Sequence, residues 1–218
     1  MILASKIPTK VALQPIVELN SLRTFGYEAL ARWSGFAPDQ IYALAEQTHC
    51  ILGLEKQIAD YIYHTYCHVP GKLFINVHPS IPDPSLWVPL HERYGYNLIL
   101  EITEGSRLNW DGIDQLRQQG FHLALDDFGS GYANINTLFQ MKPDYIKLDK
   151  YLVQSLNETD RTPLIHALVE QAHCNGAKVI AEGIETEDQF QAVQKAGCDY
   201  GQGYLLGHPE FLNFSTAR

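Results

Sequence analysis

The stretch VALQPIVELNSLRTFGYEALARW, residues 11–33, contains two apolar runs, 11–17 and 25–33, that are joined only by ELNSLRT. A crossover between parallel strands needs a dozen or more residues, so these two runs are predicted to pair as an antiparallel hairpin. Outward from the hairpin, further short apolar runs lie at 73–77, 97–102, 121–126, 144–149, 178–182 and 199–206. The chain therefore has eight predicted strands.

Helical patterns separate most of these runs, and two of the helices are marked at both ends. The apolar stripe of the segment TPLIHALVEQAHCNG comprises Leu164, Ile165, Leu168, Val169 and Ala172. Pro163 lies near the start of this segment and Gly176 lies at its end, as is typical of helix boundaries. The second helix opens with Thr186 and Gln189 at capping-box spacing and ends at Gly197.

Strands that alternate with helices are typical of parallel βαβ units, and eight such strands in 218 residues favour a closed barrel over an open sheet. We therefore predict an α/β fold, a TIM-like (β/α)8 barrel that is distorted by one antiparallel strand near the N-terminus. No internal repeat, low-complexity tract or linker divides the sequence. Residues 1–218 are accordingly expected to form a single domain.

The charge balance restricts the partners. The chain has 25 acidic and 16 basic residues, a formal net charge of -9, which argues against DNA or RNA duplexes as ligands. An anionic ligand would need local cations to hold it. No apolar run approaches the roughly 20 residues that a membrane span needs, and the first residues lack a signal-peptide pattern. We therefore expect a cytoplasmic protein with no membrane partner.

The four cysteines predict neither a metal knuckle nor a disulfide framework. Cys50, Cys67, Cys174 and Cys198 lie far apart in the sequence, without C-x-x-C or Cys/His zinc spacing. We interpret them as reduced thiols.

Polar residues stand where the predicted strands end. They are Glu28, Asn76, Glu101, Asp126, Asp127, Lys147, Asp149 and Glu182. In barrels of this type such residues converge at the C-terminal mouth, where six carboxylates without compensation would repel one another. Divalent cations such as Mg²⁺ or Mn²⁺ suit hard oxygen ligands, and two ions bridged by Asp126 could clamp a phosphodiester displacement. A single acidic residue at a strand end is more often a turn former or helix cap, so the argument depends on the convergence.

A second signal is the stretch DDFGSGY, residues 126–132. Its two adjacent carboxylates are followed by Gly129 and Gly131, which permit positive φ angles and a tight mobile loop. An ordinary glycine turn is the alternative, since the pattern does not match a phosphate-binding loop.

Taken in order, the motifs resemble the EAL domain family of bacterial cyclic-di-GMP-specific phosphodiesterases, named for the tripeptide that stands here as Glu28-Ala29-Leu30. The resemblance extends over LQPIV, YEALARW, FINVHPS, LEITE, ALDDFGSGY, DYIKLD, VIAEGIET and GCDYGQGYLLGHP. It implies metal-dependent hydrolysis of cyclic-di-GMP to linear 5′-pGpG, with two Mg²⁺ or Mn²⁺ ions per site.

The resemblance also implies roles for single residues. One ion would be held by Glu28, Asn76, Glu101 and Asp126, and the other by Asp126 and Asp127, with Asp149 and Glu182 acting on it directly or through water. Lys147 would hold and polarise the attacking water. Glu182 is also regarded in this family as a general base, an assignment that stays open because metal ions already lower the pKa of water.

Further contacts follow from the same resemblance. The substrate contacts would be made by Gln14, Leu30, Arg32, Glu185, Gln202 and Pro209, and Glu104 would anchor the DDFGSGY loop. A fixed guanidinium at Arg32 also suits a dianionic ligand on physical grounds, because the whole chain is acidic. His78 is close to Asn76, but a packing or supporting role is expected for it since Mg²⁺ prefers oxygen.

Two alternatives remain beside the enzyme. Some relatives keep the fold and ligand but have lost catalysis and serve as receptors, although degenerate members usually lack part of the acidic set, which is complete here. The other alternative is a barrel phosphodiesterase for a different substrate. The resemblance further implies a homodimer through helices near the DDFGSGY loop, and regulation by a sensory domain or partner that this chain does not contain.

Overall fold

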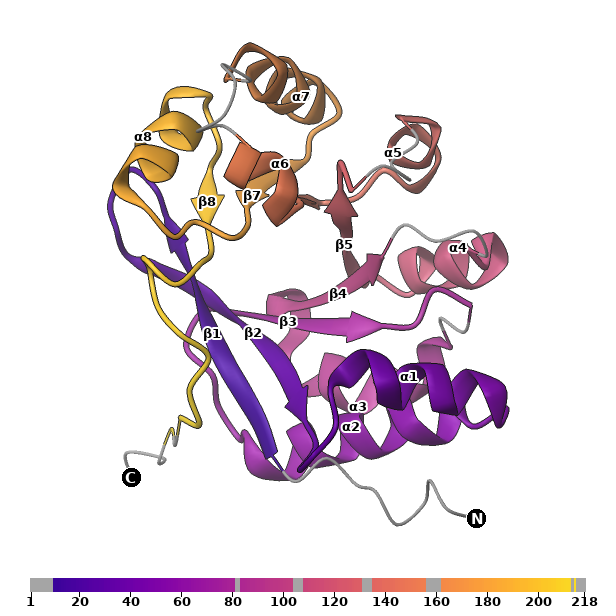
Figure 1. The fold of residues 1–218 in the computed structure, drawn as a ribbon. Helices are drawn as coiled ribbons and strands as arrows, with labels where there is room; N and C mark the ends of the chain where they lie inside the picture. Colours follow the sequence, from indigo (N-terminus) through magenta and orange to yellow (C-terminus); the bar gives the residue numbers. More distant parts are fainter. Residues whose placement is uncertain are drawn as a thin grey trace.

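The computed structural model describes residues 10–80, 83–103, 108–130, 135–155, 162–212 and 214. Its strands close into a barrel in chain order, and β8 returns to β1 (Figure 1). The strands are β1 Lys10–Glu18, β2 Thr24–Arg32, β3 Lys72–Val77, β4 Leu98–Thr103, β5 His122–Phe128, β6 Tyr145–Leu148, β7 Lys178–Ala181 and β8 Tyr200–Gly201. The predicted α/β barrel is thus confirmed.

The direction of β1 gives the barrel its distortion. This strand is antiparallel to both of its neighbours, β2 and β8, whereas every pair from β2–β3 to β7–β8 is parallel. In the β1–β2 hairpin, Gln14 lies opposite Glu28, which brings both side chains to the same end of the barrel. The short linker between the first two apolar runs therefore has the predicted effect.

The last strand is shorter than the sequence predicts. Only Tyr200 and Gly201 of the apolar run 199–206 are in strand conformation, and the chain turns after Gln202. Gly203 explains the turn, because its backbone lies so close to Ile184 that a Cβ there would overlap the Ile184 backbone. The prediction of a strand over the rest of this run is wrong.

Helices surround the strands. They are α1 Pro38–Gln47, α2 Ile51–Thr65, α3 Pro84–Tyr94, α4 Trp110–Gln118, α5 Ile135–Met141, α6 Lys150–Gln154, α7 Thr162–Cys174 and α8 Glu187–Lys195, with a 3₁₀ turn η2 at Gly95–Asn97. The capping box of α8 is confirmed, since the Thr186 side chain accepts from Gln189 N and the Gln189 side chain accepts from Thr186 N. None of the described helices is long and apolar enough to cross a membrane.

One member of the predicted α7 stripe is misplaced. Ile165, Val169 and Ala172 are buried, but Leu164 is 51% exposed. One residue rotates the side chain direction by about 100° along a helix of 3.6 residues per turn, so Leu164 lies beside the buried face and not on it.

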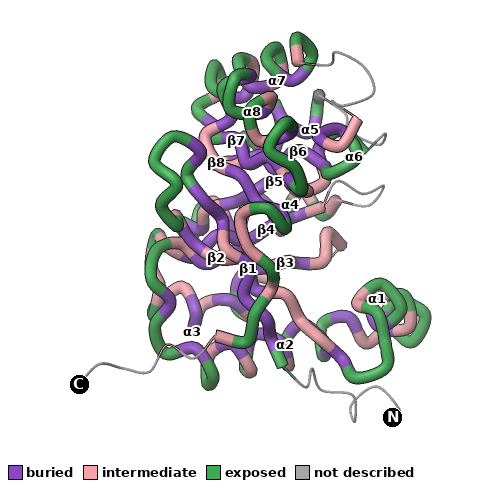
Figure 2. Tube along the Cα trace, turned by 60° about the vertical axis from the view of Figure 1, so that its left-hand side comes forward, coloured by how far each residue is buried: buried purple, intermediate pink, exposed green. Residues whose placement is uncertain are grey.

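Two layers of side chains fill the barrel along its axis. The lower layer is apolar and consists of Ile16, Phe74, Ile99, Ala124 and Ile180, with Phe25, Tyr145 and Tyr200 packed against it. Figure 2 shows the buried positions concentrated in the strands and the exposed ones on the surrounding helices. Side chains alternate across a strand, so the residue two positions beyond each inward apolar residue also points inward, one layer closer to the C-terminal mouth. This register positions the polar residues described next.

Candidate active site

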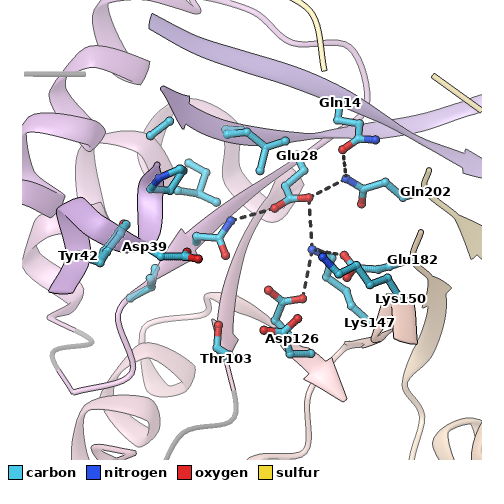
Figure 3. A pocket seen from close by; sticks show the side chains of 18 of the residues that line it. Gln14, Glu28, Asp39, Tyr42, Thr103, Asp126, Lys147, Lys150, Glu182 and Gln202 are labelled. Carbon is cyan, nitrogen blue, oxygen red and sulfur yellow. Dashed lines mark hydrogen bonds and ion pairs between the residues drawn. The ribbon is translucent and has the colours of Figure 1, made fainter. Parts of the chain in front are cut away.

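Strand alternation brings the predicted strand-end residues together. Asn76 follows Phe74, Glu101 follows Ile99, and Asp126 follows Ala124 by two positions, so each rises from the apolar layer toward the mouth. By the same spacing, Lys147 and Glu182 follow Tyr145 and Ile180 on β6 and at the end of β7. Figure 3 shows Glu28, Asp126, Lys147 and Glu182 directed toward one another in a single pocket.

The Lys147 ammonium lies at the centre of this cluster. Its Nζ is 2.8 Å from Glu101 Oε1, 2.8 Å from Glu182 Oε1, 3.2 Å from Asp126 Oδ1 and 3.4 Å from Glu28 Oε2. The Lys147 side chain is 1% exposed, and burial of an ammonium is tolerated only with such pairing. In this arrangement Lys147 neutralises part of the charge of four carboxylates at once.

Glu28 is held in place by two side-chain amides, one from β3 and one from the residue after β8, and a third amide supports the second. Asn76 Nδ2 donates to Glu28 Oε1 at 2.9 Å, and Gln202 Nε2 donates to Glu28 Oε2 at 2.6 Å. Gln202 Nε2 also donates to Gln14 Oε1 at 3.1 Å, and Gln14 Nε2 donates to Gly207 O at 3.1 Å. Gln14 and Gln202, predicted as substrate contacts, therefore both belong to the hydrogen-bond network that orients Glu28.

Burial and mutual repulsion separate the pKa values of the carboxyl groups. Burial alone would raise the pKa of Glu28, but Lys147, Gln202 and Asn76 together hold it below its ordinary value. Burial raises the pKa of Glu182 to about 8, against the attraction of Lys147. Burial also raises the pKa of Glu101, and the Glu28 charge adds to that rise. The cluster thus holds more negative charge than Lys147 alone compensates.

Burial and neighbouring charges also shift the pKa values of Lys147 and the two aspartates. Burial opposes charge on Lys147, but the surrounding carboxylates, Asp126 and Glu101 foremost, raise its pKa well above the ordinary value. Burial raises the pKa of Asp126, and burial together with the Asp126 and Asp149 charges raises the pKa of Asp127 to about 6.

The donor set fits divalent cations with oxygen ligands. Asp126, Asp127 and Glu182 each place a carboxylate oxygen within 4.8 Å of the others. Glu101 is fully buried, and its Oε2 atom has no hydrogen-bond partner among the described residues. A carboxylate oxygen is an acceptor only, and hard oxygen donors are the ligands that Mg²⁺ and Mn²⁺ prefer.

A local irregularity of β5 brings Asp127 into this group. The pairing of β5 with β6 shifts register between Leu125 and Phe128, and Asp127 has a positive φ of 56°. Such a bulge re-aims the side chains around it, so that consecutive aspartates reach the same cluster instead of opposite faces of the strand.

Two predicted residues, Asp149 and Pro209, do not line the cavity, and a third is not described. Asp149 is buried and caps α6, with its Oδ1 accepting from Tyr151 N at 2.8 Å, which is the alternative role that a strand-end acid commonly has. Glu104, the predicted loop anchor, lies outside the described residues, as do Gly131 and Tyr132 of the DDFGSGY segment. Pro209 is partly buried and lies outside the lining of the cavity.

The cluster opens into a cavity of about 820 Å³ at the C-terminal end of the barrel. Leu30, Arg32 and Glu185, three of the predicted substrate contacts, line it together with Gln14 and Gln202. Arg32 Nη1 donates to Ala31 O at 3.1 Å, and Glu185 Oε1 accepts from Gln154 Nε2 at 3.2 Å. A cavity of this size accommodates a ligand of dinucleotide dimensions.

The cavity wall also contains residues outside the predicted site. Tyr42 and Glu46 of α1 line it, as does His78, whose Nε2 is 3.0 Å from Glu46 Oε1. Lys150 also lines it, and its position directly after Asp149 could have indicated this. His78 contacts Glu46 and Ser80, in keeping with the supporting role expected for it.

Comparison with known proteins adds an independent finding. The model of the EAL domain matches residues 8–209. The probable cyclic di-GMP phosphodiesterase PdeB of Escherichia coli is 33% identical over 94% of this chain and 44% of its own length. The probable cyclic di-GMP phosphodiesterase PdeI of the same organism is 32% identical over 90% of this chain and 28% of its own length. The chain spans less than half the length of these two curated relatives.

Solved structures agree with the fold. A complex of the PaMucR phosphodiesterase with c-di-GMP superposes with a TM-score of 0.79 at 26% identity, covering 92% of this chain and 91% of that one. A calcium and cy-diGMP complex of BlrP1 from Klebsiella pneumoniae gives a TM-score of 0.80 at 27% identity, covering 94% and 58%.

Proposed function

The chain belongs to the EAL domain family, and from this premise we propose that it hydrolyses one phosphodiester of cyclic di-GMP to give linear 5′-pGpG in the presence of a divalent metal. The observation that carries the proposal is the acidic cluster around Lys147, which opens into a cavity of about 820 Å³. The phosphodiesterase names of the relatives and the c-di-GMP complexes of the structural neighbours support it.

We propose that metal is held by Glu28, Asn76, Glu101 and Asp126 at one position and by Asp126 and Asp127 at another, with Asp149 and Glu182 assisting at the second. Two ions, Mg²⁺ or Mn²⁺, would fit this set, and the manganese and calcium complexes of BlrP1 support a divalent cation. Bound divalent ions would lower the pKa of the attacking water and stabilise the leaving oxygen.

The side chains of the protein provide the remaining chemistry. A water oxygen forms a new bond to phosphorus, the bond from phosphorus to the 3′ oxygen breaks, and the products carry a 5′ phosphate and a 3′ hydroxyl. Lys147 positions the water and keeps the carboxylates together, and Glu182, in the ionised form that bound cations would favour, accepts the proton of the water. Asp127 belongs to the reacting part of the site, because one of its carboxylate oxygens lies within 4.8 Å of carboxylate oxygens of Asp126 and Glu182.

We propose that the rest of the cavity binds the substrate. Arg32 would pair with a phosphate oxygen, and Leu30 and Glu185, which also line the cavity, would contact the substrate. Pro209 would lie near a guanine. Gln14 and Gln202 would contact the substrate from the network that holds Glu28, because Gln202 Oε1 is buried and has no hydrogen-bond partner among the described residues. Glu104 is proposed to anchor the DDFGSGY loop.

Two further proposals concern the location and the assembly of the protein. A cytoplasmic location agrees with four free cysteines, of which Cys67 and Cys174 are exposed, as expected in a reducing compartment. A homodimer would be detected by light scattering, and a separate regulatory domain or partner would be detected by its effect on turnover.

The test is chromatographic separation of cyclic and linear dinucleotides after incubation with Mg²⁺, Mn²⁺, Ca²⁺ or a chelator. Linear product is expected with Mg²⁺ or Mn²⁺, and it should disappear with the chelator and in Glu28→Gln. The matched control is Glu170→Gln, because Glu170 is an exposed glutamate of α7. Binding without product would contradict the enzyme and indicate a receptor, and competition by a different cyclic dinucleotide would indicate another substrate.

A further inference from the structure

The cavity has a second ammonium group that the proposed mechanism does not use. Lys150 is the first residue of α6 and lines the cavity together with Glu182. Figure 3 shows its side chain directed toward the group around Lys147. Within the described parts of the chain, no carboxylate oxygen lies within 4.0 Å of its Nζ, and the Nζ lies over the Tyr151 ring, 5.2 Å from the ring centroid.

Lys147 is poorly placed to bind the substrate phosphates itself. It is 1% exposed, and four carboxylates already surround its ammonium. The cations among the described residues that line the cavity are Arg32, Lys147 and Lys150. Among the described residues, a ligand with two phosphodiester charges therefore has Arg32 and Lys150 as its cationic side-chain partners in the cavity.

Barrel topology separates these two cations. Arg32 ends β2, and Lys150 follows the last residue of β6 by two positions. The closed order places β2 and β6 four strands apart in a ring of eight, which is directly across the mouth. A cyclic dinucleotide carries its two phosphates on opposite sides of its ring, so cations across the mouth match that separation.

The local backbone makes room for the lysine stem. Gly183 has a φ of 66° and lies against Lys150, where a Cβ on Gly183 would overlap the Lys150 Cβ. The stem of Lys150 is thereby brought beside the end of β7 and Glu182. The helix dipole does not explain a lysine at position 150, because the peptide dipoles disfavour a cation in the first turn of a helix.

We propose that Lys150 is a further substrate-binding residue, which pairs with one phosphodiester of the cyclic dinucleotide while Arg32 pairs with the other. This inference rests on the proposed function. A charged hydrogen bond to phosphate is directional and short, and its loss should weaken binding without removing the ligands of the metal.

The test compares Lys150→Gln and Lys150→Arg with Lys195→Gln, which removes an exposed lysine at the end of α8. Calorimetry with cyclic di-GMP and Ca²⁺ measures binding, hydrolysis with Mn²⁺ measures KM and kcat, and titration with Mn²⁺ alone measures the metal site. We expect Lys150→Gln to raise Kd and KM about ten-fold, the effect of one lost charged hydrogen bond. Lys150→Arg should retain most of the affinity, and added salt should weaken wild-type binding more than that of Lys150→Gln.

The outcomes are distinguishable. Equal affinities of Lys150→Gln and Lys195→Gln for cyclic di-GMP would overturn the role of Lys150 and leave the proposed function intact. A parallel loss of Mn²⁺ affinity in Lys150→Gln would also overturn it, because the residue would then act through the metal site. If the wild-type protein neither binds nor hydrolyses cyclic di-GMP, the proposed function fails and this inference fails with it.

Discussion

Gln202 Nε2 donates a 2.6 Å hydrogen bond to Glu28 Oε2, and so joins the residue after the two-residue strand β8 to the middle of β2. The contact links positions that lie 174 residues apart in the chain. It links two strands at the C-terminal mouth of the barrel, on the side of the antiparallel strand β1, which contributes Gln14 to the same network. Glu28 therefore depends for its orientation on the C-terminal end of the fold.

The first prediction concerns this hydrogen bond. Replacing Gln202 by Ala removes a donor to a buried carboxylate, and with it part of the force that keeps the pKa of Glu28 low. We expect kcat/KM for cyclic di-GMP to fall about 10- to 100-fold, since hydrogen bonds to charged groups are worth that factor. The exposed Gln191→Ala on α8 is the control. Equal activity of the two variants would show that Asn76 and Lys147 suffice to hold Glu28.

The second prediction concerns Lys147 and metal removal. Lys147→Met leaves Glu28, Glu101, Asp126 and Glu182 without their shared cation, and loss of one partner of a buried ion pair costs about 3–5 kcal/mol. In chelator, the melting temperature should fall well below that of wild type, and Mn²⁺ should restore more of it in the variant, because binding to the native state stabilises it.

Differential scanning fluorimetry with and without Mn²⁺ measures this difference, and Lys195→Met serves as the surface control. A chelated Lys147→Met protein as stable as the control would contradict the view that Lys147 holds the carboxylates together. It would show that protonation of the carboxyl groups relieves the repulsion instead.

The barrel could be predicted because its signals are local. Strand runs, helix caps at Thr186 and Gln189, and the short linker after the first run all act within a few residues. The convergence of Glu28, Glu101 and Asp126 follows from the same alternation once the barrel is closed. The early end of β8 could not be predicted, because it depends on the distant Ile184 backbone packing against Gly203.

The contacts within the site depend on how side chains from different strands meet in the folded barrel. The sequence indicates Lys147 as a strand-end residue, but its pairing with four carboxylates requires strands β2, β4, β5 and β7 to meet around it. The positive φ of Asp127 arises from pairing between β5 and β6, which no short pattern specifies. The position of Lys150 directly after Asp149 indicates a place near the mouth, but the direction of its side chain also depends on Gly183, which lies beyond the end of a different strand.

The third prediction concerns a buried carboxyl group outside the cluster. Glu55 of α2 is fully buried, accepts a hydrogen bond from His78 N, and has a pKa raised by burial from 4.5 to about 8. Between these values the folded state retains a proton that the unfolded state has lost. The contribution of Glu55 to stability is therefore present below about pH 4.5 and is lost as the pH rises to 8.

Glu55→Gln removes this titration and keeps the shape of the side chain. The free energy of unfolding of the variant should rise relative to wild type by at most about 1.4 kcal/mol per pH unit between pH 5 and 8. Urea unfolding at four pH values measures it, and Glu92→Gln on the exposed side of α3 is the control. A difference that does not change with pH would mean that Glu55 is ionised in the folded protein throughout.

The fourth prediction separates the two ends of the barrel. Asp199 precedes β8 at the end opposite the mouth, where it accepts from Val179 N at 2.9 Å and pairs with Lys178 Nζ at 2.7 Å and His173 Nε2 at 2.8 Å. Burial alone would raise the pKa of Asp199, but these three partners lower it. Its contribution to stability is therefore present above the unfolded value of 3.8 and is lost as the pH falls through the lower, folded pKa.

Asp199→Asn should lower the free energy of unfolding by about 1–2 kcal/mol at pH 7, as one charged hydrogen-bond set is lost. The deficit relative to the exposed Asp114→Asn control should shrink below pH 4, because acid then neutralises the wild-type carboxylate as well. Hydrolysis of cyclic di-GMP at saturating Mn²⁺ should stay unchanged, since residues at this end of a barrel support the fold and the mouth performs the chemistry. A large loss of kcat with the fold intact would show instead that β8 transmits the disturbance through Gln202 to Glu28.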